Sequence, residues 1–321
     1  KWDEKVIELA KSLINCQSYS GHEDKAAEAL KAYIKAAGVF DEIETDCYGN
    51  VIGHIKGKNP GPKVLFDGHI DTVPVGNLKD WKHDPFHAVV EEGKLYGRGA
   101  ADMKGAVAAF TVAAHRYAVE NGKNFAGDVY VAGVVHEECF EGVAARKISE
   151  KVKPDYVVIG EASEMNLKVG QRGRAEIVVE TFGVPAHSAN PEKGVNAVYK
   201  MCEAIQAIRE IKPPVQDKLG KGILELTDVK SSPYPGASVV PEYCRATYDR
   251  RLLVGETKES VLQPIIEKME ELKKKDPQFS YKVSYAVGKE KCYTGEEIQG
   301  ERFFPGWLFG AEEEWVAKIK S

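Results

Sequence analysis

Three short runs of apolar residues in the first half of the chain are each followed at once by ionisable residues. Runs of this length suit buried β-strands and are too short for helices. The runs are residues 64–66, 129–135 and 156–159, followed by His69 with Asp71, by Glu137 with Glu138, and by Glu161. Polar side chains at the carboxyl ends of such strands face the crevice where open α/β sheets bind ligands. We therefore expect these side chains to share one site; the alternative is plain solvation of the strand ends.

The rest of the first half alternates between helix and strand patterns. Helices are predicted at residues 1–13, 24–37, 105–121 and 141–151, and strands at residues 42–45, 51–56 and 63–66. A capping box from Ser20 to Glu23 is expected to begin the second helix. Residues 57–62, rich in glycine and proline, predict a turn. This alternation, with its apolar strands, favours an α/β fold with a mixed, mostly parallel sheet and helices on both faces.

From residue 175 onward the pattern changes. Strands are predicted at residues 175–181, 223–229, 246–253 and 281–287, and helices at residues 195–211 and 258–275. The order strand, helix, strand, strand, helix, strand is that of a ferredoxin-like (βαββαβ) split unit. The second half is therefore predicted to fold as a unit of its own.

Composition and charge narrow the class of protein. Hydrophobic residues make up 43% of the 321 residues, which allows a sizeable core and suits two domains. The net charge is −5 with lysine and arginine dispersed, so no basic stripe indicates nucleic acid. No apolar stretch approaches the ~20 residues of a membrane span, and the first residues resemble an amphipathic helix rather than a signal peptide. Six cysteines without a CxxC pair indicate reduced thiols in a cytoplasmic protein.

The chemistry of the strand-end residues points to a metal. His69 and Asp71 are two residues apart, so both can face the crevice while the residue between them points away. A further carboxylate, Asp102, follows a glycine-rich approach and precedes a strongly helical segment. One histidine and two aspartates on adjoining loops suit a borderline divalent ion such as zinc. The alternatives are a turn-capping role for Asp71 and a solvated acidic turn at Glu137 and Glu138.

Five motifs occur in a fixed order along the chain: GHIDTVP, GRGAADMKG, HEE, GEAS and PAHSANPEKGVNAV. Together they resemble the dinuclear-zinc amidohydrolases and metallopeptidases, the family of acetylornithine deacetylase, succinyl-diaminopimelate desuccinylase, carboxypeptidase G and aminoacylase. The resemblance runs from Ser18 to about residue 285. In finer detail, the stretches HEECFEG, KSSPYPGASVVP and KVSYAVGKE most resemble the YgeY-type hydrolases linked to selenium metabolism.

The resemblance implies a pair of zinc ions, with cobalt or manganese as substitutes, that clamp an amide oxygen and activate a shared water. Asp102 would bridge the two ions. His69 and Glu161 would complete the first metal site, and Glu138 would serve the second. The family pattern also implies a cis peptide bond between Asp102 and Met103.

Three neighbouring residues would act around the metals. Asp71 would orient His69 and fix its tautomer. Glu137 would be the general base that takes a proton from the water and carries it to the leaving nitrogen. His136, which precedes the acidic pair, would be a core or supporting residue.

In the resembled family the ferredoxin-like unit is a lid inserted into the catalytic domain, and its edge strand and helix commonly form a homodimer. We accordingly predict a metal-binding catalytic domain at residues 1–174, a lid at residues 175–290 and the start of a return to the catalytic domain at residues 291–321. His187 would stabilise the oxyanion, in the partner subunit's site. Arg251 would bind a substrate carboxylate. The alternatives are a backbone-capping loop histidine and a surface ion pair, respectively.

One departure from the family pattern affects the second metal. The family takes a last ligand from a histidine near its C-terminus, whereas all eight histidines here lie at or before His187. The resemblance therefore implies a longer chain, and residues 1–321 alone are expected to hold at most one ion firmly, to show little activity and to aggregate readily.

The predicted function is metal-dependent hydrolysis, through a metal-bridged water, of the amide bond in a small N-acyl, N-carbamoyl or peptidyl amino acid. The alternative is a metal-binding but catalytically inactive partner or scaffold protein. Neither a nucleic acid nor a membrane is expected as a partner.

Overall fold

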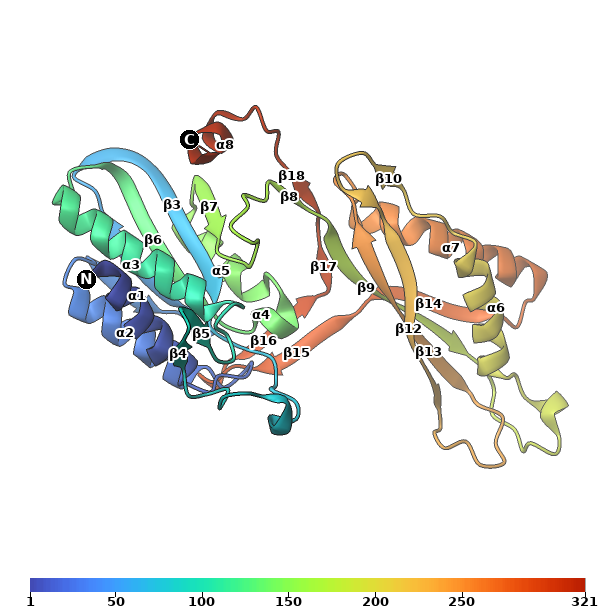
Figure 1. The fold of residues 1–321 in the computed structure, drawn as a ribbon. Helices are drawn as coiled ribbons and strands as arrows, with labels where there is room; N and C mark the ends of the chain where they lie inside the picture. Colours follow the sequence, from blue (N-terminus) through green and yellow to red (C-terminus); the bar gives the residue numbers. More distant parts are fainter. Residues whose placement is uncertain (321) are drawn as a thin grey trace. The chain divides into compact units, whose positions relative to one another are not determined.

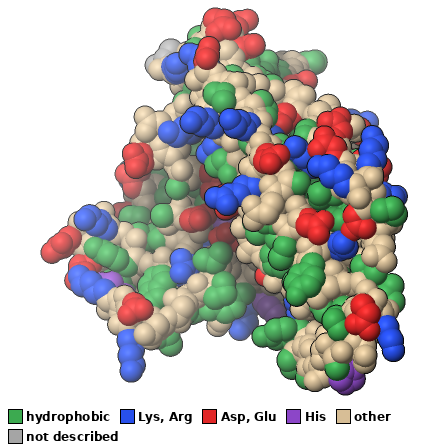
Figure 2. Space-filling model, turned by 90° about the vertical axis from the view of Figure 1, so that its right-hand side faces the viewer, with side chains coloured by type: hydrophobic (Ala, Val, Ile, Leu, Met, Phe, Trp, Pro, Cys, Tyr) green, Lys and Arg blue, Asp and Glu red, His purple; other side chains and the backbone are tan. Residues whose placement is uncertain are grey.

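The computed structural model describes residues 1–320, and the chain divides into two compact units (Figure 1). Unit 1 comprises Lys1–Asn166 and Lys289–Gly300, and unit 2 comprises Leu167–Gly288 and the segment that begins at Glu301. Each unit has its own hydrophobic core. Acidic and basic side chains are intermixed on the face drawn in Figure 2. Within residues 1–320, every helix is too short or too polar to span a membrane.

A five-stranded sheet forms the centre of unit 1. Its spatial order is β1-β2-β6-β3-β7, with β1 and β2 antiparallel to their neighbours and β6, β3 and β7 parallel to one another. The strands are β1 Glu42–Thr45, β2 Val51–Lys56, β3 Asn59–His69, β6 Ala126–Val134 and β7 Tyr156–Ile159. His69 pairs with Val134, and Asp67 pairs with Ile159. The carboxyl ends of the three parallel strands therefore meet at one edge, and the predicted mixed α/β class is confirmed.

Helices cover both faces of this sheet. The ring of Phe66 stacks on Phe110 of helix α3, whereas Lys63, which points to the other face, donates its Nζ to the backbone oxygen of Val152 at the end of helix α5. Helices α1 and α2 pack on the same side as α3 (Figure 1). The helices are α1 Trp2–Ile14, α2 Asp24–Ala37, α3 Lys104–Asn121, α4 Glu137–Phe140 and α5 Val143–Val152.

One local prediction in unit 1 is wrong, and the bounds of another are shifted. The glycine- and proline-rich residues 57–62 are not a turn, because β3 already begins at Asn59 and pairs irregularly with β6 up to Lys63. Gly61 permits this pairing, since an added Cβ would lie only 2.5 Å from the backbone nitrogen of Gly127. The helix predicted at residues 141–151 is present as α5 Val143–Val152. It begins two residues later than predicted because Glu141, with a φ of 47°, separates it from α4.

Unit 2 is an antiparallel sheet with two helices. The element order is β9 Gly173–Phe182, α6 Ala197–Arg209, β12 Ile223–Ser232, β13 Tyr243–Leu252, α7 Lys258–Lys275 and β14 Ser280–Tyr285. The strands lie in the order β12-β13-β9-β14, as expected for a ferredoxin-like unit. Alternate residues of β9, namely Ala175, Ile177 and Val179, are fully buried in a core shared with α6 and α7. The other face of the sheet is more exposed.

Shorter elements complete the two units. The hairpin of β15 and β16 contributes to unit 1 through residues 289–300, while β17 pairs with β9 and β18 with β8 in unit 2. The shorter strands are β4 Val89–Glu91, β5 Lys94–Tyr96, β8 Gly170–Gln171, β10 Val215–Gln216, β11 Gly220–Lys221, β15 Val287–Lys291, β16 Glu297–Glu301, β17 Phe303–Phe304 and β18 Trp307–Leu308. The shorter helices are the 3-10 turns Leu78–Asp80 and Pro191–Lys193, and α8 Glu314–Lys320.

Candidate metal centre

Three carboxylates approach the imidazole of His69 at the carboxyl end of β3. The Nε2 atom of His69 lies 3.0 Å from Oδ1 of Asp102, 3.4 Å from Oε1 of Glu161 and 3.9 Å from Oε2 of Glu137. His69 is buried, whereas the side chains of Asp102, Glu137 and Glu161 are between about a third and two thirds exposed. The carboxylates follow β5, β6 and β7 along the chain, so one buried nitrogen is surrounded by acidic groups from separate loops.

Two sets of donor atoms in unit 1 are close enough to hold a cation. One set is His69, Glu137 and Glu161, and the other is His69, Asp102 and Glu138; within each set the ligand atoms lie within 4.8 Å of one another. The structure thus brings together all the residues that the sequence suggested as ligands. The grouping of these residues differs from the expected one, because Glu137, expected as the general base, lies in the same set as Glu161. A histidine and several carboxylates form a donor set that suits zinc, cobalt or manganese.

The electrostatics of this cluster favour a cation. Burial alone would lower the pKa of His69, but the carboxylates of Glu161, Asp71 and Glu137 raise it to about 10. Burial raises the pKa of Glu137 to about 7, and the charges of neighbouring carboxylates contribute to the same shift. Burial likewise raises the pKa of Glu138. A bound divalent ion would replace the imidazolium proton as the positive charge that these carboxylates share.

Buried residues next to Asp102 fix the loop that carries it. The peptide bond between Asp102 and Met103 is cis, as the family resemblance implied, and the Met103 side chain is fully buried. Lys104 begins helix α3 and is also fully buried; its Nζ donates to the backbone oxygens of Leu13 and Cys16, at 2.9 and 2.8 Å. These bonds fix the start of α3 to the end of α1, and so they hold the loop immediately before it.

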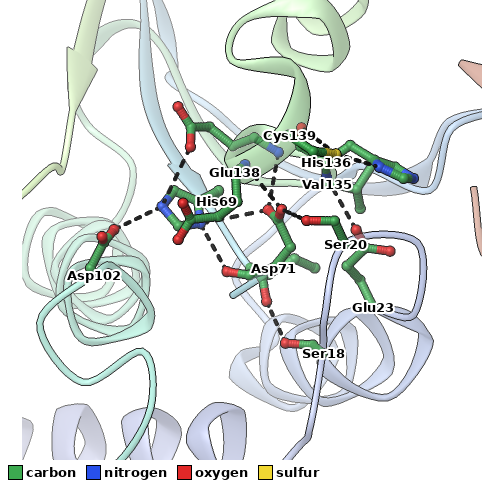
Figure 3. A network of polar contacts seen from close by, with 12 residues as sticks. Ser18, Ser20, Glu23, His69, Asp71, Asp102, Val135, His136, Glu138 and Cys139 are labelled. Atoms are coloured by element: carbon green, nitrogen blue, oxygen red, sulfur yellow. Dashed lines mark hydrogen bonds and ion pairs between the residues drawn. The ribbon is translucent and has the colours of Figure 1, made fainter. Parts of the chain in front are cut away.

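Asp71 connects the histidine to the acidic turn. The Nδ1 atom of His69 lies 2.9 Å from the backbone oxygen of Asp71 and 3.6 Å from its Oδ1. The carboxylate of Asp71 accepts hydrogen bonds from the hydroxyl of Ser20 at 2.7 Å and from the backbone N–H groups of Glu137 and Glu138, each at 3.1 Å (Figure 3). The backbone of Asp71 therefore orients His69, while its side chain fixes the turn that carries Glu137 and Glu138.

Residues that sequence reasoning missed complete this turn. The backbone N–H of Val135 donates to Oδ1 of Asn50 at 3.0 Å, and that of His136 donates to Oε1 of Glu23 at 3.1 Å. The predicted capping box is wrong, because Glu23 is itself the N-cap of α2 and its side chain makes no cap hydrogen bond. The Ser20 hydroxyl bonds to Asp71 instead. The side chains of Ser20 and Glu23 therefore contact residues distant in the sequence and do not cap the helix that follows them.

His136, predicted to be a core or supporting residue, is buried. Its Nδ1 atom lies 3.2 Å from the sulfur of Cys139, and burial lowers its pKa (Figure 3). Neither of the two candidate cation sets found within residues 1–320 includes it.

The two remaining candidates, His187 and Arg251, lie in unit 2. His187 is exposed, and its Nδ1 accepts the backbone N–H of Ala189 at 3.1 Å, so a neutral ring carries its proton on Nε2. Arg251 is on β13 and its Nε donates to Oδ1 of Asp249 at 3.0 Å. Both alternatives raised from the sequence, a backbone-capping histidine and a surface ion pair, thus have a counterpart in the structure, and the proposed roles of the two residues remain predictions.

Comparison with known proteins identifies the class of this arrangement. Residues 65–235, more than half of the chain, match the model of peptidase family M20/M25/M40. Protein YgeY of Escherichia coli is 31% identical over 312 residues, covering 94% of this chain and 73% of YgeY. Succinyl-diaminopimelate desuccinylase of Marinobacter nauticus is 32% identical over 276 residues, covering 81% of this chain and 71% of the enzyme.

A solved structure supports the fold. The YXEP protein of Bacillus subtilis, described as a dinuclear metal-binding peptidase from the M20 family, aligns with a TM-score of 0.68 at 14% identity, covering 99% of this chain and 80% of that protein. The fold is that of the M20 metallopeptidases, and unit 1 carries the two candidate cation sets around His69. The chain belongs to peptidase family M20/M25/M40, and it is therefore a hydrolase that acts on peptides or acyl amino acids.

Proposed function

We propose that the protein is a zinc-dependent amidase that cleaves the amide bond of an N-acyl, N-carbamoyl or peptidyl amino acid. The observation that carries this proposal is the convergence of carboxylates from separate loops on the buried Nε2 atom of His69. The desuccinylase relative removes an acyl group, and the YXEP neighbour is described as a peptidase. Both reactions break a C–N bond of an amide, and this shared chemistry is the basis of the proposed substrate class.

The proposed metal ligands are His69, Asp102, Glu138 and Glu161, with Asp102 shared between two ions. Cobalt or manganese would substitute for zinc, because the donor set of nitrogen and oxygen accepts all three. When bound, the ions would polarise the amide oxygen and activate a water held between them.

Glu137 is the proposed general base. It lies beside the ligands on the turn held by Asp71, and its pKa, raised by burial to about 7, suits proton transfer near neutral pH. Glu137 would take a proton from the water as the water oxygen bonds to the amide carbon. It would then give that proton to the nitrogen as the C–N bond breaks, which yields a carboxylic acid and an amine.

Unit 2 supplies the residues proposed to contact the substrate. We assign residues 175–290 as a lid and homodimerisation domain. The Nε2–H of His187 would donate to the developing oxyanion in the partner subunit's site, since Nδ1 already accepts from Ala189. Arg251 would bind a substrate carboxylate and would exchange its bond to Asp249 for that contact.

A substrate panel with controlled metal content tests the proposal. The protein is stripped of metal, reloaded separately with zinc, cobalt or manganese, and assayed for release of free amino acid from N-acetyl, N-succinyl, N-carbamoyl and dipeptide substrates. Metal-dependent release from one substrate class is expected, and Glu164→Gln, an exposed carboxylate three residues from Glu161, should behave as the parent. Tight metal binding without release from any substrate would instead favour a catalytically inactive, metal-binding scaffold.

A further inference from the structure

Four consecutive backbone N–H groups in unit 1 are all bound by side-chain oxygens. They belong to residues 135–138: the first donates to Asn50, the second to Glu23 and the last two to Asp71. Figure 3 shows Glu23 and Asp71 beside this segment. The acceptors lie between 66 and 113 residues away in the sequence. This segment joins the end of β6 to α4, and it places Glu137 and Glu138 beside His69.

The segment needs external support because of its backbone conformation. His136 has a φ of 56° and a ψ of 23°, which is the left-handed region that residues other than glycine seldom adopt. Such a conformation persists only where surrounding structure imposes it. The N–H of this residue is the one that Glu23 accepts, so the least favourable residue of the segment depends on the Glu23 carboxyl.

Glu23 differs from the other two acceptors. The Asp71 carboxylate accepts three hydrogen bonds, and the Asn50 amide donates to Asp46 and Ala144 in addition to accepting from Val135. Glu23 is fully buried, and its Oε1 accepts from both Gly21 and His136. Its Oε2 is buried and has no hydrogen-bond partner within residues 1–320.

A buried carboxyl with one unsatisfied oxygen is unfavourable for folding. Burial raises the pKa of Glu23 to about 7, and the nearby charge of Asp71 acts in the same direction. The neutral form, which resembles a glutamine side chain in shape, is therefore substantially populated near pH 7. An acceptor oxygen at this place, rather than a negative charge, is what the His136 backbone requires.

From this geometry we propose that Glu23 is a positioning residue of the active site. Its Oε1 atom holds the His136 backbone, and thereby it directs Glu137 and Glu138 toward His69. The effect on catalysis rests on the proposed amidase function, but the effect on the backbone does not.

Hydrogen exchange on the metal-free protein tests the backbone part directly. In Glu23→Ala, amide exchange in a peptide spanning residues 134–140 should accelerate about tenfold, as expected for the loss of one buried acceptor. In Glu23→Gln, which keeps an acceptor oxygen, exchange should stay within about twofold of the parent. Unchanged exchange in Glu23→Ala, or equal acceleration in both variants, would overturn the proposal.

A matched variant separates positioning from general destabilisation. Ile34 is buried near the other end of the same helix, α2. Its apolar side chain cannot accept a hydrogen bond from residues 135–138. Ile34→Ala should lower the melting temperature, yet it should not accelerate exchange at residues 134–140 more than elsewhere in unit 1. If Ile34→Ala had the same selective effect as Glu23→Ala, Glu23 would be no more than a core residue.

Kinetics on the preferred substrate test the catalytic part. Glu23→Ala should lower kcat at least about tenfold with little change in KM, because a displaced Glu137 impairs proton transfer and not binding. Glu23→Gln should restore most of kcat. Should the parent protein release amino acid from no substrate, the proposed function fails, while the exchange experiment still decides the role of Glu23.

Discussion

The turn at residues 135–138 and the β9–β13 ladder of unit 2 fix their backbones in different ways. In the ladder, hydrogen bonds from main chain to main chain align ten residue pairs, from Gly173↔Leu252 to Phe182↔Tyr243. In the turn, four N–H groups bond to three distant side chains. A ladder survives most side-chain substitutions because its bonds do not involve them. The turn depends on the identity of each acceptor, because its irregular backbone bonds to side chains and not to a neighbouring strand.

The largest effect is expected from a substitution that removes the proposed general base and leaves the backbone bonds of the turn in place. Glu137→Gln should lower kcat by about 10²–10⁴-fold, as is usual for loss of a general base. The backbone bond from residue 137 to Asp71 is retained, so metal content should not change. Steady-state kinetics with metal analysis on the same sample make the measurement, with Glu164→Gln as the control. Turnover at the parent rate would remove Glu137 from the mechanism.

Two substitutions measure whether the turn is more sensitive than the ladder: one removes an acceptor of the turn, and the other changes a side chain of the ladder. Asp71→Ala removes the acceptor of three hydrogen bonds at a fully buried site and should cost roughly 3–5 kcal/mol of unfolding free energy. Asp249→Ala, on β13, breaks partly exposed ion pairs with Arg174 and Arg251 and should cost less than about 1 kcal/mol. Urea unfolding of both variants measures the difference. Similar losses would show that the turn is no more sensitive than the ladder.

The pH dependence of stability tests the buried carboxyl of Glu23. Its pKa is raised from 4.5 to about 7 on folding, so the folded state binds the proton more tightly than the unfolded state. The stabilising contribution is therefore complete below pH 4.5 and is lost as the pH rises through 7. Relative to Glu23→Gln, the parent should lose on the order of 3 kcal/mol between pH 4.5 and 8. Parallel stability curves for the two metal-free proteins would contradict this assignment.

The affinity for metal should also depend on pH, with a smaller change in free energy than the change in stability expected from Glu23. His69, whose pKa the surrounding carboxylates raise to about 10, is protonated at neutral pH before metal binds. A zinc ion on Nε2 must displace that proton, so affinity should rise about tenfold per pH unit between pH 6 and 8. Calorimetry in buffers of different ionisation enthalpy would count at least one released proton per ion. A pH-independent affinity would place the ion away from His69.

The same contrast between regions explains what could be predicted from the sequence. In unit 2, helix α7 has the predicted bounds of residues 258–275, and α6 differs from residues 195–211 by two at each end. Periodicity is a local signal, and regular ladders and helices obey it. In unit 1 the apolar runs before His69, Glu137 and Glu161 also correspond to strands β3, β6 and β7.

What could not be predicted is the set of contacts that hold the site. Glu23 reaches His136 across 113 residues, and Asn50 reaches Val135 across 85. A side chain that bonds to a distant backbone leaves no periodic pattern, and the spacing of Ser20 and Glu23 predicts only a local contact, the capping box. The strand that replaces the predicted turn at residues 57–62 has the same origin, because it depends on close approach to Gly127.

The separation in sequence between the turn and its acceptors also has a kinetic consequence. The N–H groups of residues 135–138 cannot acquire their partners until the segments around Glu23, Asn50 and Asp71 have all docked on the sheet. Contacts of such long range form slowly, because the loops must close before the bonds compensate for the lost entropy. We therefore expect the turn to be among the last parts of unit 1 to form during folding, after strand β6, which precedes it.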